Sequence, residues 1–176
     1  MKNRMKIIFF IIIFLFTGII YGALKKIKAP DFSLFDLNNK IVRLSKFKNK
    51  IIILNFFATW CPPCRMEIPG LIEFYKEYKS RGVVLLGICL DAKNIKKVRK
   101  FAKSYKINYP VLIGTRKVVM DYGGIRAIPT TFFINHNGEI VDRIIGYADE
   151  EELKAIVDKL IKIRDAQIKK WKRFQK

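Results

Sequence analysis

The stretch that decides the fold runs from residue 51 to residue 69 and reads IIILNFFATWCPPCRMEIP. Its first seven residues are apolar but for one, which is typical of a central strand covered on both faces. After Cys61 the apolar side chains recur at three- and four-residue steps, the spacing of a helix, and Pro69 is expected to kink that helix. The stretch therefore predicts a buried strand that leads into a helix, with a pair of cysteines at the junction.

The cysteine pair has the spacing Cys61-Pro62-Pro63-Cys64. Two cysteines so placed on the first turn of a helix can close a small disulfide ring. Unpaired N–H groups and the helix dipole favour an anion there, which lowers a thiol pKa from about 8.5 into the range of roughly 3.5–7.5. Cys61 is therefore expected to be exposed and ionised and to attack disulfides. Cys64, one turn inside, is expected to be more buried and to resolve the mixed disulfide, while Pro62 and Pro63 fit the first turn.

A structural disulfide and a zinc site are the alternatives for this pair. A structural disulfide seldom uses such tight spacing where a strand gives way to a helix. A zinc site needs four ligands, and the chain offers only Cys89 and His136 besides the pair, the first within an apolar strand and the second in a turn. The motif thus favours a redox pair with no metal and no cofactor, and Cys89 is interpreted as a small buried hydrophobic residue.

Outside this stretch the pattern alternates strands and helices. Short apolar runs bounded by turn signals predict strands at 32–35, 41–44, 83–90, 111–113, 131–135 and 139–145. Helical spacing predicts helices from Asn94 to about Tyr105, around 117–122, and from Asp149 onward, where Glu152 completes a capping box. The order indicates an α/β fold whose mixed central sheet carries helices on both faces, with the strands at 51–57 and 83–90 parallel.

The N-terminus has the pattern of an export signal. Lys2, Arg4 and Lys6 precede an uncharged, largely apolar run from residue 7 to residue 24. Its 18 residues are just enough to span a bilayer as a helix, and an uncleaved anchor is preferred over a cleaved signal. Either reading predicts an extracytoplasmic domain, in the periplasm or on the outer face of the cytoplasmic membrane.

The net charge is strongly positive, since 35 Lys and Arg face 15 Asp and Glu, giving +20. These basic residues are scattered, so a solvated basic surface is preferred over nucleic-acid binding. A local excess of eight basic residues and one acid lies between residues 159 and 176, beside Trp171 and Phe174. This tail could contact an anionic membrane, although a solvated helix end is preferred. The expected organisation is a signal or anchor (1–24), a linker (25–30), one domain (31–165) and a basic helical extension (166–176).

Residues 55–69 resemble the active-site stretch of thioredoxin-like proteins, and more narrowly that of TlpA/ResA-like membrane-anchored thiol-disulfide oxidoreductases. The resemblance covers about residues 29–160 and includes the opening Ala-Pro-Asp-Phe at 29–32 and the segment Ile-Pro-Thr-Thr-Phe at 128–132. It implies a thioredoxin fold with an added N-terminal β-hairpin and a central strand–helix insertion. It also implies reduction of disulfides in exported proteins, for example apocytochrome c during cytochrome c maturation, with a membrane thiol donor that reduces the pair again.

The resemblance also implies roles for single residues. A cis-proline at Pro129 would face the cysteines, and the backbone of Ile128 would pair with an extended substrate segment. Trp60 would shield the disulfide and, with Pro62 and Pro63, form part of the substrate surface. A packed core aromatic is the alternative for Trp60.

The buried Cys64 must lose a proton when it attacks, and a carboxylate close by would help. Cytoplasmic thioredoxins carry an acid six residues before the first cysteine, where this chain has Asn55, which cannot ionise. Glu67 lies three residues after Cys64 and so on a neighbouring face of the helix, and the TlpA/ResA-like family also carries a Glu there. Glu67 is therefore the expected proton acceptor; the alternative is a glutamate favoured only by the helix dipole.

Two competing functions remain at this point. A peroxidase of the peroxiredoxin type shares the Ala-Pro-Asp-Phe opening, but would want Thr or Ser three residues before its reactive cysteine, where Cys61 stands. A copper-binding chaperone would want a well-placed histidine, and His136 lies in a turn. The sequence favours a dithiol-disulfide oxidoreductase that works as a reductant.

Overall fold

The computed structural model describes residues 27–91 and 94–175. The expected signal or anchor at residues 1–24 lies outside these. Among the described residues, no helix is both long enough and apolar enough to cross a membrane.

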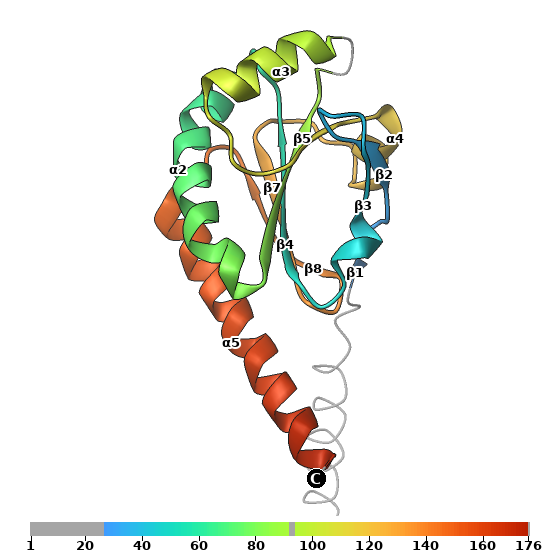
Figure 1. Cartoon of the computed structure of the whole chain (residues 1–176), viewed down its shortest axis with the longest axis vertical. Helices are drawn as coiled ribbons and strands as arrows, with labels where there is room; N and C mark the ends of the chain where they lie inside the picture. The colour runs from blue at the N-terminus through green and yellow to red at the C-terminus, as the bar shows by residue number, and fades with distance from the viewer. Residues whose placement is uncertain (1–26, 92–93, 176) are drawn as a thin grey trace, which may run out of the picture.

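Strands and helices alternate along most of the chain (Figure 1). The strands are β1 (Ile27–Lys28), β2 (Ser33–Phe35), β3 (Ile41–Arg43), β4 (Ile51–Phe57), β5 (Val83–Cys89), β6 (Val111–Ile113), β7 (Thr130–Ile134) and β8 (Glu139–Ile145). The α-helices are α2 (Pro62–Tyr78), α3 (Ile95–Ser104), α4 (Arg116–Asp121) and α5 (Glu150–Phe174), with short 3-10 helices at Leu44–Phe47 and Lys79–Arg81. The predicted strands and helices are thus all present, with ends that differ by a residue or two.

The six-stranded sheet has the order β1-β8-β7-β4-β5-β6, and β2 and β3 form a separate hairpin. β4 pairs in parallel with β5 and antiparallel with β7, so the sheet is mixed. Between β5 and β7 the chain adds the outer strand β6, with α3 before it and α4 after it. The predicted mixed sheet, parallel central strands and N-terminal hairpin are confirmed.

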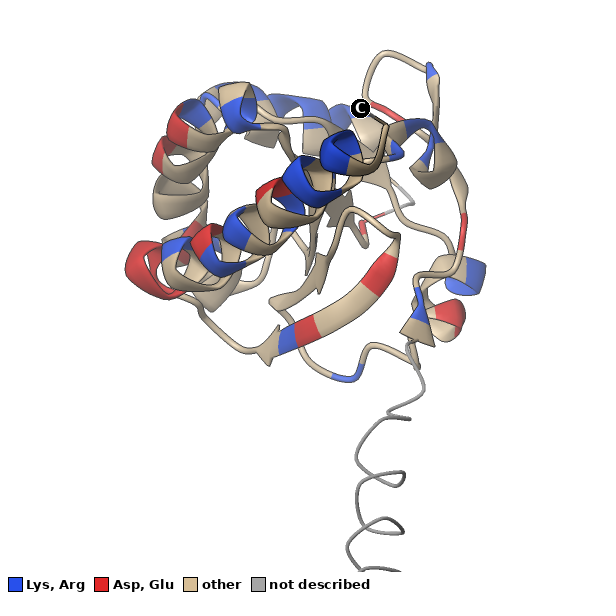
Figure 2. Cartoon of the chain, turned by 90° about the horizontal axis from the view of Figure 1, so that it is seen from below, with Lys and Arg blue, Asp and Glu red and all other residues tan. Residues whose placement is uncertain are grey.

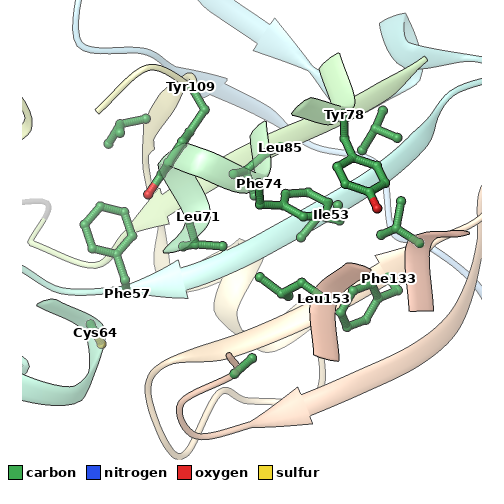
Figure 3. Packing of buried hydrophobic residues seen from close by; sticks show 14 of the residues in the cluster. Ile53, Phe57, Cys64, Leu71, Phe74, Tyr78, Leu85, Tyr109, Phe133 and Leu153 are labelled. Carbon is green, nitrogen blue, oxygen red and sulfur yellow. The ribbon is translucent and has the colours of Figure 1, made fainter. Parts of the chain in front are cut away.

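Two apolar clusters hold helices against opposite faces of the sheet. One contains side chains of α2, α3 and α5, and Figure 3 shows part of it, with Cys64 at one edge. The other contains side chains of α4 and of the β2–β3 hairpin. All seven residues of β4 are buried between the two clusters, as the apolar run predicted. The strand that carries the cysteine pair at its end is therefore buried along its whole length.

Three local features refine the sequence reading. β1 lies inside the segment interpreted as a linker, yet it joins the edge of the sheet, where Ile27 pairs with Ile140 of β8. α2 continues through Pro69 to Tyr78. At the start of α5 the side chain of Asp149 accepts a hydrogen bond from the Glu152 N–H at 2.8 Å, which confirms Asp149 as the N-cap residue of the predicted capping box.

Candidate active site

Cys61 and Cys64 are joined by a disulfide where β4 gives way to α2. Cys61 is the N-cap residue of α2, and its sulfur accepts a hydrogen bond from the Cys64 N–H at 3.3 Å. A side chain in this position faces the unpaired N–H groups of the first helical turn. In the reduced protein the same N–H group would stabilise a thiolate on Cys61.

Both cysteines are buried in this disulfide form, with 3% of Cys61 and 1% of Cys64 exposed. The expectation of an exposed Cys61 is therefore wrong for this state. The cover comes from a distant loop, since the Ile128 carbonyl oxygen lies 3.6 Å from the Cys61 sulfur. Pro62 and Pro63 are exposed, as is Trp60 at 64%, so these residues form the surface around the buried sulfurs and Trp60 is not a packed core aromatic.

The loop that covers Cys61 contains a cis peptide bond between Ile128 and Pro129, as the resemblance implied. Pro129 is buried and Ile128 is partly exposed. The Pro129 carbonyl accepts a hydrogen bond from the Gly146 N–H at 2.8 Å, which ties this loop to the end of β8. The neighbouring residues Ile145 and Tyr147 are 57% and 50% exposed, so apolar side chains surround the loop as well as the cysteines.

Glu67 lies one turn after Cys64 on α2 and is only 2% exposed. One carboxylate oxygen accepts a hydrogen bond from the Asn55 side chain of β4 at 2.8 Å, and the other accepts one from the Ala148 N–H at 3.2 Å. Asn55 also donates to the Thr131 hydroxyl of β7 at 2.9 Å. Burial raises the pKa of Glu67 from 4.5 to about 7, against the two hydrogen bonds, which lower it. The carboxyl group thus has the pKa expected of an acid–base group at neutral pH.

Residues 26–143 match the family model described as the AhpC/TSA family. The chain belongs to this family. Thiol-disulfide oxidoreductase ResA of Bacillus subtilis (strain 168) is 40% identical over 122 residues, which are 69% of this chain and 68% of that protein. ResA of Geobacillus thermodenitrificans (strain NG80-2) is 36% identical over 126 residues, 72% of each chain.

Solved structures agree with these relatives. A thiol:disulfide interchange protein of the thioredoxin family from Chlorobium tepidum TLS is 33% identical with a TM-score of 0.74, covering 80% of this chain and 99% of its own. StoA from Bacillus subtilis is 30% identical with a TM-score of 0.63, covering 72% of this chain and 96% of its own. The thioredoxin fold is confirmed, and this member of the AhpC/TSA family is a ResA-like thiol-disulfide oxidoreductase.

One residue of this ResA-like site escaped the sequence analysis. Asp91 follows β5, and one of its carboxylate oxygens accepts hydrogen bonds from both the N–H and the hydroxyl of Thr59, the former at 3.0 Å. Thr59 lies two residues before Cys61, so Asp91 fixes the loop that enters the active site. An acid directly after a buried parallel strand, beside the carboxyl end of its neighbour, was the available signal.

The residues considered for other chemistries lie apart from the cysteine pair. Cys89 is fully buried, as expected, and burial raises its pKa to about 12, so its thiol is unreactive. His136 lies in the turn between β7 and β8, where Nε2 is 2.8 Å from the Gln167 side-chain oxygen. Across residues 27–91 and 94–175, no three His, Cys, Asp or Glu side chains gather as metal ligands would. His136 therefore does not join Cys61 and Cys64 in a copper site.

Proposed function

We propose that Cys61 and Cys64 are the redox pair through which this chain exchanges disulfides with exported proteins outside the cytoplasm. The observation that carries the proposal is the position of the pair: a disulfide at the N-terminus of α2, facing the Ile128 carbonyl. Cys61 is the N-cap residue of α2 and Cys64 lies inside the helix, so Cys61 suits the attacking thiol and Cys64 the resolving one.

The reaction begins with the reduced pair. The Cys61 thiolate attacks one sulfur of the substrate disulfide, forms a mixed disulfide and releases the other substrate sulfur as a thiolate, which takes up a proton. Cys64 then loses its proton and attacks the Cys61 sulfur. The Cys61–Cys64 disulfide closes, the substrate leaves with two thiols, and two electrons have passed to it.

Glu67 is proposed to accept the Cys64 proton. Cys64 and Glu67 are three residues apart on α2 and therefore on neighbouring faces of the helix. With a pKa near 7, the carboxylate can take up a proton and return it to water in the same pH range. Its hydrogen bonds from Asn55 and Ala148 keep both oxygens in place, so they hold the acceptor beside the buried thiol.

The surface around the disulfide suits an extended polypeptide. The backbone of Ile128 lies next to the Cys61 sulfur, where a substrate strand can pair as an added β-strand. Trp60, Pro62 and Pro63 are exposed beside it and can pack against the side chains of that strand. Unfolded exported chains, apocytochrome c among them, have this form.

The proposed setting is the periplasm or the outer face of the cytoplasmic membrane, with the N-terminal segment as signal or anchor. The basic cluster and the uncharged run up to residue 24 support it. Thiols outside the cytoplasm become oxidised unless they are reduced again, so the pair requires a membrane thiol donor if it works as a reductant.

Replacement of the two cysteines tests the proposal. Cys61→Ser should abolish insulin reduction, while Cys64→Ser should retain Cys61 and accumulate mixed disulfides with exported proteins in cells, identifiable by mass spectrometry. Cys89→Ala is the matched control and should reduce insulin at the parental rate. Parental rates in both serine variants would refute the assignment, and trapped partners confined to the cytoplasm would refute the setting.

A further inference from the structure

The last helix, α5, continues well beyond the domain that it packs against (Figure 1). In its first half, Leu153, Val157 and Leu160 are buried against the sheet. Further along the helix, Arg164 still contacts the domain, where its side chain donates a hydrogen bond to the Arg81 carbonyl at 2.9 Å. From residue 165 to residue 175 every side chain is exposed, so we refer to residues 165–175 as the tail.

The tail keeps the apolar stripe of the helix although it has no core to cover. Ile168, Trp171 and Phe174 are 44%, 60% and 77% exposed. At about 100° per residue, these three side chains fall within an arc of about 120°, on the same side as the buried residues of the first half. An apolar stripe that includes two aromatic rings therefore faces solvent.

The opposite side of the tail is basic. The tail contains four Lys and Arg and one acid, Asp165, which is paired with Arg164. By the same helical spacing, Lys169 and Arg173 lie opposite Trp171, while Lys170 and Lys172 flank the apolar stripe on either edge. Figure 2 shows Lys and Arg recurring along this part of α5. Basic residues on one side of a helix and Trp and Phe on the other are typical of helices that lie in the interface of an anionic membrane.

The tail projects from the end of the domain that lies opposite the cysteine pair. It leaves the domain at the end where β1 begins, whereas α2 starts at the opposite end, beside α3 (Figure 1). The cysteine pair, at the start of α2, is therefore at the far end of the molecule from the tail. The chain enters its first strand on the tail side, where a membrane anchor preceding Ile27 would reach the domain.

We propose that the tail is an interfacial helix that lies on anionic lipid headgroups and holds the domain with its cysteine pair facing away from the bilayer. A second copy of the chain is the weaker candidate for the apolar stripe, because two tails side by side would bring eight positive charges together against only two acids. The lipid surface instead supplies the complementary charge. This contact is separate from disulfide exchange and does not depend on it.

The test uses the full chain reconstituted in bilayers of phosphatidylcholine, alone or mixed with phosphatidylglycerol. Trp60→Phe leaves Trp171 as the only tryptophan, so its emission reports on the tail alone. We expect brominated lipid to quench Trp171 in the anionic bilayer and much less in the neutral one. Since each basic residue near an anionic surface strengthens contact about fivefold, Lys169→Glu with Lys170→Glu should reduce quenching to the neutral level.

Lys96→Glu with Lys100→Glu on α3 is the matched control, because it changes the net charge equally at the other end of the molecule and should leave quenching unchanged. Without the Trp60 change, the Lys169 and Lys170 variant should still reduce insulin at the parental rate, which shows that the domain is folded. Trp171 that is shielded but not quenched would mean that protein covers the stripe, either a second copy or residues 1–26. That result, or equal quenching in both bilayers, would overturn the proposal.

Discussion

At the scale of single residues, the site depends on a buried carboxyl group. Glu67 is held by Asn55, which stands where the related cytoplasmic proteins carry an acid, and by the Ala148 backbone. An amide at position 55 donates to the carboxylate, whereas a second acid there would repel it. In this chain the ionisable group is therefore on the helix, at Glu67, and not on the strand, at position 55. The two side chains are in contact, so the group remains in the same site.

Glu67→Gln is expected to slow resolution of the mixed disulfide by about 10²-fold, because the amide cannot accept the Cys64 proton. In the parental chain the rate should rise as pH increases through about 7, where Glu67 ionises, and this rise should be absent from the variant. Stopped-flow release of a substrate thiol across the neutral range measures both. Glu73→Gln, exposed on the same helix, is the control, and an equal slowing there would contradict the role of Glu67.

Glu67 should also make the stability of the oxidised protein depend on pH. Its pKa is raised on folding, so its contribution is fully present below pH 4.5 and is lost as pH rises through about 7. A shift from 4.5 to about 7 corresponds to a loss of about 3 kcal/mol relative to Glu67→Gln. Urea unfolding of both disulfide-bonded proteins at several pH values tests this. Parallel pH profiles would show that the buried carboxyl group is ionised as easily as in the unfolded chain.

At the scale of elements, β4 and α2 were predictable because their signal is local. The apolar run, the change to helical spacing after Cys61 and the two prolines all lie within one continuous stretch. The burial of Cys61 was not predictable in this way, since its cover, Ile128, lies 67 residues later in the sequence. The sequence analysis also missed β1, because two residues are too few to show a strand pattern. They form a strand only because they pair with β8, which is distant in the sequence.

Asp91 connects the end of β5 to the loop that leads into α2. Asp91→Ala leaves the N–H and hydroxyl of Thr59 without their acceptor and should lower the free energy of unfolding by about 2 kcal/mol. The exchange rate should fall as well, because the loop positions Cys61. Asp91→Asn keeps one acceptor oxygen and should lose less of both. Denaturant unfolding and insulin reduction measure the two effects, and an alanine variant as stable and active as the parent would contradict them.

At the scale of the whole molecule, the two ends of the domain differ. One end has buried sulfurs within an exposed apolar surface, and the other has a helix that extends beyond the core. The fold was predictable in outline because seven of the eight described strands, and the helices that connect them, each carry a clear pattern. The basic composition of the last residues predicted a helical extension at 166–176, but the apolar stripe of α5 continues into it, so only the structure reveals which part of that stripe is exposed.

Removal of residues 166–176 should leave the domain intact, since every described residue of that segment is exposed. The free energy of unfolding should change by no more than about 0.5 kcal/mol, because surface changes of this kind have small effects. The insulin reduction rate should remain at the parental value. Calorimetry and the insulin assay check both, and a chain that unfolds after this truncation would mean that the domain extends past residue 165.

The Ile128 carbonyl beside the Cys61 sulfur restricts the access of molecules that reduce the Cys61–Cys64 disulfide. Only 3% of Cys61 is exposed in the disulfide form, so we expect a donor cysteine at the tip of a narrow protrusion to reach it more easily than one set in a flat or recessed face. The shape of the donor should therefore influence, together with its reduction potential, which of the surrounding thiols reduces the pair.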